Sequence, residues 1–318
     1  MDYLVVAFYQ FQPIQNPSQE VKRWKAFFAS LDAKGRIYLS SEGVNAQMSL
    51  LASEMETFQE WLKTEYPEAE LKIDPHHEHA FAKMTIKVRE QLAALDRKVD
   101  LSKGGEYLSS DAWAKMLEER DEDTLVLDVR NDYEWEVGHF EGAEKPQMQT
   151  FREFPQFAKA LSEKRDVKKT KVMMYCTGGI RCELYSCLMK EEGFEQVYQL
   201  EGGVIKYGQT KGNQHWKGNL FVFDDRLVTA IAGEKNAPIS HCTFCNCAID
   251  TYYNCAHMDC NKLFISCIDC AIQMKGCCSS ACIDQPRRRP FEPKKQPKPF
   301  RKLSVEQKSA LKDPSSCQ

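Results

Sequence analysis

The chain contains 318 residues, 42 % of them apolar, which is enough to build the cores of two ordinary domains and a smaller module. Its formal net charge of -3 excludes binding of nucleic acid through the field of the whole molecule, so any such binding needs a local basic patch. No run of about 18 apolar residues occurs, and the short apolar stretch at the N-terminus lacks a basic flank. The sequence therefore predicts a cytoplasmic protein without a membrane anchor or an export signal.

Residues 1–95 show alternating signals for strands and helices. An apolar run at residues 3–11 predicts a strand, and apolar side chains at helical spacing between Val21 and Leu31 predict a helix. Residues 37–48 alternate in hydrophobicity around a Glu-Gly turn, which is typical of a hairpin.

A second helix and a last strand complete this first unit. Ser53, with Glu56 three residues later, forms a capping-box pattern for a helix that carries Phe58 and Leu62 on one face. Residues 84–88 then close the unit as a strand. The order strand, helix, strand, strand, helix, strand predicts a ferredoxin-like (acylphosphatase-like) α+β domain, a fold that hosts many functions.

Residues 105–225 predict an α/β domain with a central parallel sheet, after a polar linker. Short apolar strands at residues 124–129, 171–175 and 197–200 alternate with helical segments, as in folds with parallel sheets. Ligands of such sheets gather at the carboxyl ends of the strands. Cys176 directly follows one of these strands.

Cys176 begins the loop Cys-Thr-Gly-Gly-Ile-Arg, which ends at Arg181 and leads directly into a helix. The backbone N–H groups of such a turn, together with the positive end of the helix dipole, favour an anion. We therefore expect a lowered pKa for the Cys176 thiol, which makes it a nucleophile. Gly178 and Gly179 are expected to let the loop curl without a Cβ clash, while Arg181 adds a cation at the rim or fixes the loop.

Three motifs of this domain resemble the rhodanese family: the Cys176 loop, Asp128-Val129-Arg130-Asn131 followed by Glu134, and Gly138-His139-Phe140-Glu141-Gly142-Ala143. The loop cysteine of that family carries a persulfide. The resemblance implies that Cys176 is the catalytic nucleophile and that Arg181 is a second catalytic residue, in the loop near the substrate. It also implies a set of residues that support the site structurally: Asp128, Arg130, Glu134, His139, Gly178 and Gly179.

Two other roles for Cys176 have less support. A single cysteine is more often a buried, inert thiol, but here the loop, the helix and both upstream motifs agree on chemistry. Dual-specificity phosphatases use a similar cradle for phosphate with five residues between cysteine and arginine, whereas this loop has four, and a smaller ring suits a sulfur atom better. Cys182 is either a resolving thiol or part of the core.

Residues 240–284 form a cysteine-rich module that predicts two metal sites. Eight ligands in four pairs at metal-binding spacing indicate two sites of four thiolates each. Zinc is the default metal, because closed tetrahedral sulfur sites need no redox activity and can fold a segment that lacks a core. An iron–sulfur cluster would use the same ligands. The pairs are Cys242 with Cys245, Cys255 with Cys260, Cys267 with Cys270 and Cys278 with Cys282; a cross-brace of first with third and second with fourth is one arrangement, and Cys247 and Cys277 are left over.

Residues 285–318 form a basic, proline-rich tail that is expected to be disordered. Between Gln285 and Lys302 the chain has eight Lys or Arg residues against one Glu. The tail is a candidate RNA contact, with Phe291 and Phe300 stacking on bases, and a purely solvated tail is the alternative. The basic residues expected to meet RNA phosphates are Arg287, Arg288, Arg289, Lys294 and Lys295.

Matching stretches run along nearly the whole chain: Gly35-Arg36-Ile37, Glu42-Gly43-Val44-Asn45, Phe81 to Arg89, Asp128 to Ala143, Cys176 to Glu183, Glu201-Gly202-Gly203 and Trp216 to Arg226. Through them the sequence resembles the tRNA uridine hydroxylase family with a central rhodanese domain, although Ala46 stands where glycine is expected. The resemblance implies oxygen-dependent 5-hydroxylation of the wobble uridine, position 34, with the anticodon loop of tRNA as partner and molecular oxygen as co-substrate. Two structural zinc ions and a sulfur or electron donor protein complete the expected set, and no nucleotide cofactor is evident.

Two other functions stay open at this point. A sulfurtransferase would move persulfide sulfur without oxygen, and the two additional domains argue against it because they would be idle. A docking module would not need Cys176, and the intact loop cysteine argues against that reading.

Overall fold

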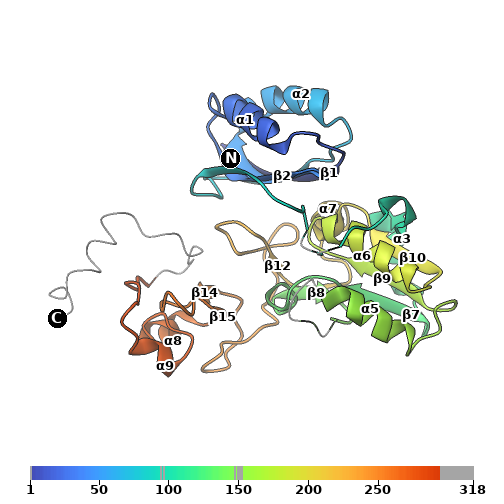
Figure 1. Cartoon of the computed structure of the whole chain (residues 1–318). Helices are drawn as coiled ribbons and strands as arrows, with labels where there is room; N and C mark the ends of the chain where they lie inside the picture. Colours follow the sequence, from blue (N-terminus) through green and yellow to red (C-terminus); the bar gives the residue numbers. More distant parts are fainter. Residues whose placement is uncertain (1, 94, 96, 147, 149–152, 294–318) are drawn as a thin grey trace. The chain divides into compact units, whose positions relative to one another are not determined.

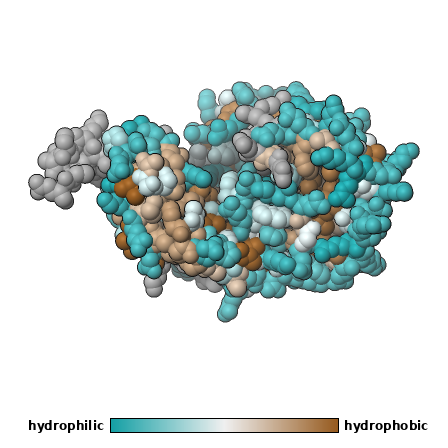
Figure 2. Space-filling model, turned by 90° about the horizontal axis from the view of Figure 1, so that it is seen from below, coloured by the Kyte–Doolittle hydropathy of each residue, from teal (hydrophilic) through white to brown (hydrophobic). Residues whose placement is uncertain are grey.

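The computed structural model describes residues 2–93, 95, 97–146, 148 and 153–293. The chain divides into two compact units: the first is Met1–Trp135, Phe140–Trp216 and Ile231–Gly233, and the second is Glu136–His139, Lys217–Ala230 and the residues from Glu234 onward. Within the described ranges no helix is long and apolar enough to cross a membrane. Hydrophilic residues cover most of the face seen in Figure 2, with hydrophobic side chains between them, as is usual for protein surfaces.

A five-stranded sheet with the order β4-β1-β3-β2-β5 begins the first unit (Figure 1). Four strands pair antiparallel, and β5 pairs parallel with β2. The ferredoxin-like domain is confirmed, and so is the predicted strand at residues 84–88, but a strand at residues 72–76 was missed. This missed strand, β4, pairs with β1 in the place expected for the last strand, so residues 84–88 form a fifth strand beside β2. The elements are β1 (Tyr3–Phe11), α1 (Pro17–Phe28), β2 (Ala33–Ser40), β3 (Gly43–Leu51), α2 (Met55–Glu65), β4 (Lys72–His76) and β5 (Met84–Val88).

Helices α1 and α2 cover one face of this sheet (Figure 1). Trp24 and Phe58 pack there against inward-facing strand residues such as Ile37 and Met48, so one core holds the layer together. The capping box predicted at Ser53 is wrong. A 3-10 turn, Ala52–Glu54, leads into α2; the backbone N–H of Met55 donates to the carbonyl oxygen of Ala52, and no side chain caps the helix.

The second part of the first unit is a four-stranded parallel sheet with the order β6-β10-β9-β7. This confirms the α/β fold with a central parallel sheet. Strand β9 is central and fully buried beyond its first residue, since helices lie on both sides of the sheet (Figure 1). The elements are β6 (Glu106–Leu108), α3 (Ser110–Glu118), β7 (Thr124–Asp128), α4 (Asp132–Trp135), α5 (Phe154–Ser162), β9 (Lys171–Tyr175), α6 (Ile180–Glu191), β10 (Gln196–Leu200) and α7 (Gly203–Lys211), with a 3-10 turn at Leu101–Lys103.

The second unit consists mainly of short elements and loops. Its cysteine-rich part has a small core in which Tyr253, Phe264 and Ala271 pack with cysteine side chains. So small a core is consistent with the expectation that metal ions, rather than apolar burial, hold this module together. The remaining short elements of the chain are β8 (Gly138–Phe140), β11 (Trp216–Gly218), β12 (Leu220–Phe221), β13 (Val228–Thr229), β14 (Tyr252–Asn254), β15 (Leu263–Ile265), α8 (Ile268–Gln273) and α9 (Ser280–Ile283).

Candidate active site and metal centres

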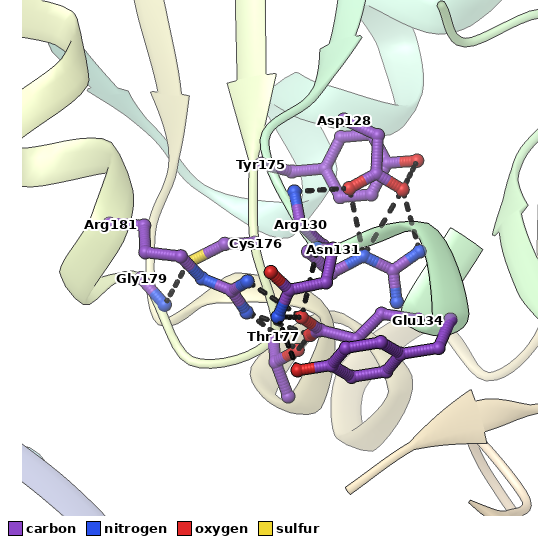
Figure 3. A network of polar contacts seen from close by, with 10 residues as sticks. Asp128, Arg130, Asn131, Glu134, Tyr175, Cys176, Thr177, Gly179 and Arg181 are labelled. Carbon is purple, nitrogen blue, oxygen red and sulfur yellow. Dashed lines mark hydrogen bonds and ion pairs between the residues drawn. The ribbon is translucent and has the colours of Figure 1, made fainter. Parts of the chain in front are cut away.

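Cys176 lies at the carboxyl end of the central strand β9, where the chain turns into helix α6. Its side chain is buried, and the backbone N–H of Gly179 donates a hydrogen bond of 3.1 Å to its Sγ atom (Figure 3). The position at the edge of a parallel sheet is therefore the one that the sequence predicted.

The surroundings of Cys176 favour a thiolate. Burial alone raises the pKa of this thiol, but a hydrogen bond from Cys182, the charge of Arg181 and the N–H groups of Arg181 and Gly179 outweigh it and lower the pKa to about 5. Burial, together with that same hydrogen bond and the Cys176 charge, raises the pKa of Cys182 well above its usual value. Cys182 is thus a neutral thiol that donates to the Cys176 thiolate.

The loop conformation depends on two glycines. Gly179 has a φ of 103°, and a Cβ atom there would lie 2.8 Å from the hydroxyl of Tyr9. Gly203, at the start of α7, has a φ of 68°, and a Cβ atom would lie 2.6 Å from the carbonyl oxygen of Cys176. The next two residues of α7 donate backbone hydrogen bonds to the carbonyls of Cys176 and Thr177, 3.0 and 3.1 Å long, which fixes the loop.

Gly178 does not have the role predicted for it. A Cβ atom at this position would meet nothing within 4 Å, and its φ lies outside the left-handed region. The glycine requirement of the loop therefore falls on Gly179.

Arg181 fixes the loop through a buried ion pair. Its guanidinium donates to both carboxylate oxygens of Glu134, at 2.7 and 2.8 Å, and Glu134 also accepts hydrogen bonds from Thr177 and Asn131 (Figure 3). Burial raises the pKa of Glu134, but Arg181 and Arg130 more than compensate and keep it below the usual value. Of the two roles considered for Arg181, the geometry favours the loop anchor.

Replacing Glu134 by glutamine is expected to lower the free energy of unfolding by about 3–5 kcal/mol, because the buried Arg181 guanidinium loses its counter-charge. Urea denaturation followed by tryptophan fluorescence measures this loss. The matched control is Glu191→Gln, which breaks a more exposed ion pair with Arg97 and should cost at most about 1 kcal/mol. Equal losses in the two variants would show that Glu134 is not an anchor.

Asp128 and Arg130 form a second buried ion pair beside the loop. Arg130 donates to both oxygens of Asp128, at 2.6 to 3.1 Å, and the hydroxyl of Tyr175 donates to Asp128 at 2.7 Å (Figure 3). The Arg130 guanidinium also lies over the ring of Trp216, 5.1 Å from its centroid. This geometry fits the structural-support role expected for Asp128 and Arg130.

The Gly-His motif lies on β8. His139 is half-buried there. A Cβ atom at Gly138 would lie 1.9 Å from the carbonyl oxygen of Asn219, so glycine is needed for close backbone packing. These features concern the scaffold rather than the surroundings of Cys176.

A cavity of about 650 Å³ is lined by residues of the five-stranded sheet, such as Tyr9 and Lys72, and by Glu183 and Gly202 of the α/β domain. Glu183 accepts hydrogen bonds from the hydroxyls of Tyr9 and Tyr107, 2.7 and 2.6 Å long, at the wall of this cavity. Lys72 lines it as well, although its side chain is 5 % exposed, and its ammonium lies 5.3 Å from the centroid of the Tyr9 ring. Burial, partly offset by the nearby Glu70 and Cys176 charges, lowers the pKa of Lys72.

Two groups of four cysteines each bring their sulfur atoms within 4.8 Å of one another. One group is Cys255, Cys260, Cys278 and Cys282, the set that the cross-brace pairs second with fourth. The other is Cys242, Cys245, Cys247 and Cys267, and Cys270 makes side-chain contacts with three of these. Both groups could hold a metal ion. Cys247, which the spacing left unassigned, thus lies in the cluster with Cys242, whereas Cys277 is buried in the core of the module.

The basic residues after Gln285 divide into two sets. Arg287 and Arg289 make backbone hydrogen bonds to the module, and Arg287 also pairs with Asp259 at 2.6 Å, so this part is not the extended chain that was expected. Phe291 packs into the module core instead of being free to stack on bases. Lys294, Lys295 and Phe300 lie outside the described residues, and RNA binding by the tail stays a prediction.

Comparison with known proteins identifies the relatives of this chain. The UPF0176 acylphosphatase like domain matches residues 3–92, the Rhodanese-like domain residues 110–210, and the Rhodanase C-terminal region residues 217–283. A tRNA uridine(34) hydroxylase of Chlamydia felis is 47 % identical over 321 residues, covering 99 % of this chain and 98 % of that protein. The protein of the same name from Protochlamydia amoebophila is 47 % identical over 302 residues, covering 94 % of each.

The chain belongs to the tRNA uridine(34) hydroxylase family. The family resemblance that the motifs indicated is thereby confirmed. Among solved structures, the rhodanese-like domain of an Anabaena protein is 20 % identical, with a TM-score of 0.30, and covers 35 % of this chain and 78 % of that one.

The sequence did not predict several residues that lie around the site of this member of the tRNA uridine(34) hydroxylase family. Lys72 and Tyr9 come from the first sheet, far from the loop in sequence, and only the fold brings them to it. Gly203 had a signal, because the Gly-Gly step follows a predicted strand, but its contact with the Cys176 carbonyl could not be read from that pattern. Cys247 could have been suspected from its spacing to Cys245.

Proposed function

We propose that Cys176 is the nucleophile with which this enzyme hydroxylates uridine 34 of tRNA. The chain is a tRNA-modifying oxidoreductase on a rhodanese scaffold, and tRNA is its substrate. The observation that carries the assignment of Cys176 is its geometry: a buried sulfur at the end of a parallel strand, held by N–H groups, with a pKa of about 5. Such a group is almost entirely a thiolate at neutral pH.

A thiolate here can activate the uracil ring by adding to carbon 6. The new S–C6 bond takes its electron pair from sulfur, and the C5=C6 pair moves to give an enolate across carbon 5 and the carbonyl at carbon 4. Carbon 5 is then a nucleophile toward an oxygen donor. Loss of the proton from carbon 5 and departure of the thiolate from carbon 6 restore the aromatic-like ring with a hydroxyl at carbon 5.

Molecular oxygen is the oxygen donor that we assign to this step. One of its atoms enters the product, and the other leaves as water, which requires two electrons and two protons from a donor. A separate electron donor protein is therefore part of the proposal.

Lys72 is the group that we assign to the developing negative charge. It is buried, it lines the cavity together with Tyr9 and Glu183, and its charge interacts with that of Cys176. An ammonium in such a low-dielectric place stabilises an enolate oxygen more than it stabilises the neutral ring. Arg181 is a positioning residue in this scheme, because Glu134 holds its guanidinium.

The two cysteine clusters are assigned to structural zinc. Their donor sets fit, since four thiolates close to one another form a closed tetrahedral site that leaves no position open for substrate. Zinc in such a site holds the module folded and takes no part in the oxidation.

Nucleoside mass spectrometry of tRNA tests the function. In cells that lack the protein, the hydroxylated uridine of position 34 should disappear, and the wild-type gene should restore it only in the presence of oxygen. Disappearance of a thiolated nucleoside instead, with hydroxylated uridine unchanged, would favour a sulfurtransferase. If the wild-type gene restores the hydroxylated uridine without oxygen, the oxygen dependence is wrong, but the hydroxylation of uridine 34 still stands.

A further inference from the structure

The five-stranded sheet has one face that its own helices do not cover. Helices α1 and α2 lie over one face (Figure 1). Side chains alternate between the two faces of a strand, and the inward set, including Ile37, Leu39 and Ile86, belongs to the core that also contains residues of α1 and α2. Arg36 and Tyr38 on β2, and Lys87 on β5, therefore project from the opposite face. Arg36 and Lys87 are exposed, and Tyr38 is half-buried.

This open face is basic. The strands contribute Lys34, Arg36 and Lys87 to the accessible part of this face, and the exposed Arg89 follows at the end of β5. Lys72 is on the same face but is buried, so it adds no accessible charge. Asp74 is the one acidic residue in these strands. The chain as a whole carries a net charge of -3, so the face stands out against the rest of the molecule and complements a phosphate backbone.

Two arginines on this face lie over aromatic rings. The Arg89 guanidinium is 4.8 Å from the centroid of the Tyr38 ring, and the Arg36 guanidinium is 5.8 Å from that of Phe81. Planar arginine and tyrosine groups on an open sheet are the surfaces on which unpaired RNA bases stack. A purely electrostatic patch would not need this pairing.

The strand register connects the basic edge with the reactive loop. Lys87 pairs with Tyr38, Tyr38 with Asn45, and Asn45 with Tyr9, so these four residues form one row across β5, β2, β3 and β1. Strands are spaced about 4.8 Å apart, so the row is about 14 Å long. At its far end the Tyr9 hydroxyl hydrogen-bonds to Glu183, seven residues after Cys176.

We propose that the open face of the five-stranded sheet binds the single-stranded nucleotides next to the target uridine. Arg36, Lys87 and Arg89 neutralise phosphates, the Arg89–Tyr38 pair stacks on a base, and the row that ends at Tyr9 leads the strand to the Cys176 loop. This inference rests on the proposed function, since it takes the anticodon loop of tRNA as the ligand.

The test measures binding of the full-length protein to fluorescently labelled tRNA from cells that lack it, at several salt concentrations. In Arg36→Ser/Arg89→Ser, the loss of two phosphate contacts should reduce the slope of log affinity against log salt by about 1.4–1.8. In Tyr38→Leu, the loss of one stacking surface should weaken binding about 5- to 100-fold with the salt slope unchanged.

The matched control is Lys22→Ser/Lys25→Ser, which removes two exposed charges from α1 on the other side of the same sheet. This variant should bind tRNA like the wild type. In all variants the rate of alkylation of Cys176 should be unchanged, which shows that the reactive loop is intact.

Unchanged tRNA binding in both open-face variants would overturn the inference, as would competition by loop-free duplex RNA as strong as that by tRNA. Neither result would contradict the proposed function, because that function is tested by the hydroxylated uridine that the wild-type protein makes. Conversely, the wild-type protein could leave uridine 34 unmodified while the open-face variants lose affinity for tRNA. This pair of results would contradict the proposed function and still support RNA binding by the open face.

Discussion

Replacing Cys176 by serine is expected to abolish hydroxylation of uridine 34, with a loss of about 10³-fold or more, while tRNA affinity and thermal stability stay close to wild type. At neutral pH the Cys176 sulfur is a thiolate, with a pKa of about 5, whereas a serine hydroxyl there would stay protonated and could not add to the uracil ring. Single-turnover assays with purified tRNA, read by nucleoside mass spectrometry, measure the loss. Residual hydroxylation near the wild-type rate would remove Cys176 from the mechanism.

The control for this variant is Cys182→Ala, which leaves the nucleophile in place. The Cys182 thiol lowers the pKa of Cys176 by donating a hydrogen bond, so its removal should shift that pKa upward. Because the thiolate is the reactive form, alkylation of Cys176 should be constant above its pKa and decline as the pH falls through about 5 in the wild type. In Cys182→Ala the decline should begin at a higher pH, and mass spectrometry of the Cys176 peptide distinguishes it from the other cysteines.

The reactive loop could be predicted from the sequence because its determinants are local. A strand, a glycine-containing turn and a helix follow one another within residues 171–191, and these elements formed as expected. The partner of Arg181 was not predicted. Glu134 lies 47 positions away in sequence, and only the parallel packing of β7 beside β9 brings the two together.

The strand missed in the first domain shows how weak short polar segments are as signals. Residues 72–76, Lys-Ile-Asp-Pro-His, contain a proline and little alternation, so they did not indicate a strand although they form the edge strand β4. Residues 84–88 alternate clearly and were taken as the closing strand in its place. Edge strands tolerate such sequences because one side of their backbone needs no partner.

Removal of metal is expected to unfold the cysteine-rich module while the two sheets of the first unit stay folded. The core of the module is small and built partly from cysteines, so apolar burial cannot replace a metal–thiolate site worth about 10–16 kcal/mol in zinc-dependent folds. Hydrogen exchange before and after treatment with a strong chelator, with metal analysis by mass spectrometry, measures the effect. We expect two ions per chain, and protection lost only within residues 240–293.

Neighbouring cysteines provide the control for this prediction. Cys278 belongs to a cluster and Cys277 does not, although Cys277 is buried in the module core and Cys278 packs against it. Cys278→Ala should therefore lose one ion and the protection of the module, whereas Cys277→Ala should keep both ions. In the cluster of Cys242, Cys245 and Cys267, the fourth ligand is either Cys247 or Cys270. Replacing each of these two by alanine identifies the ligand, because only loss of the ligand releases the metal. If the purified protein is brown and contains iron, the clusters hold iron–sulfur centres and not zinc. If the module keeps full protection from hydrogen exchange after chelation, it folds without metal.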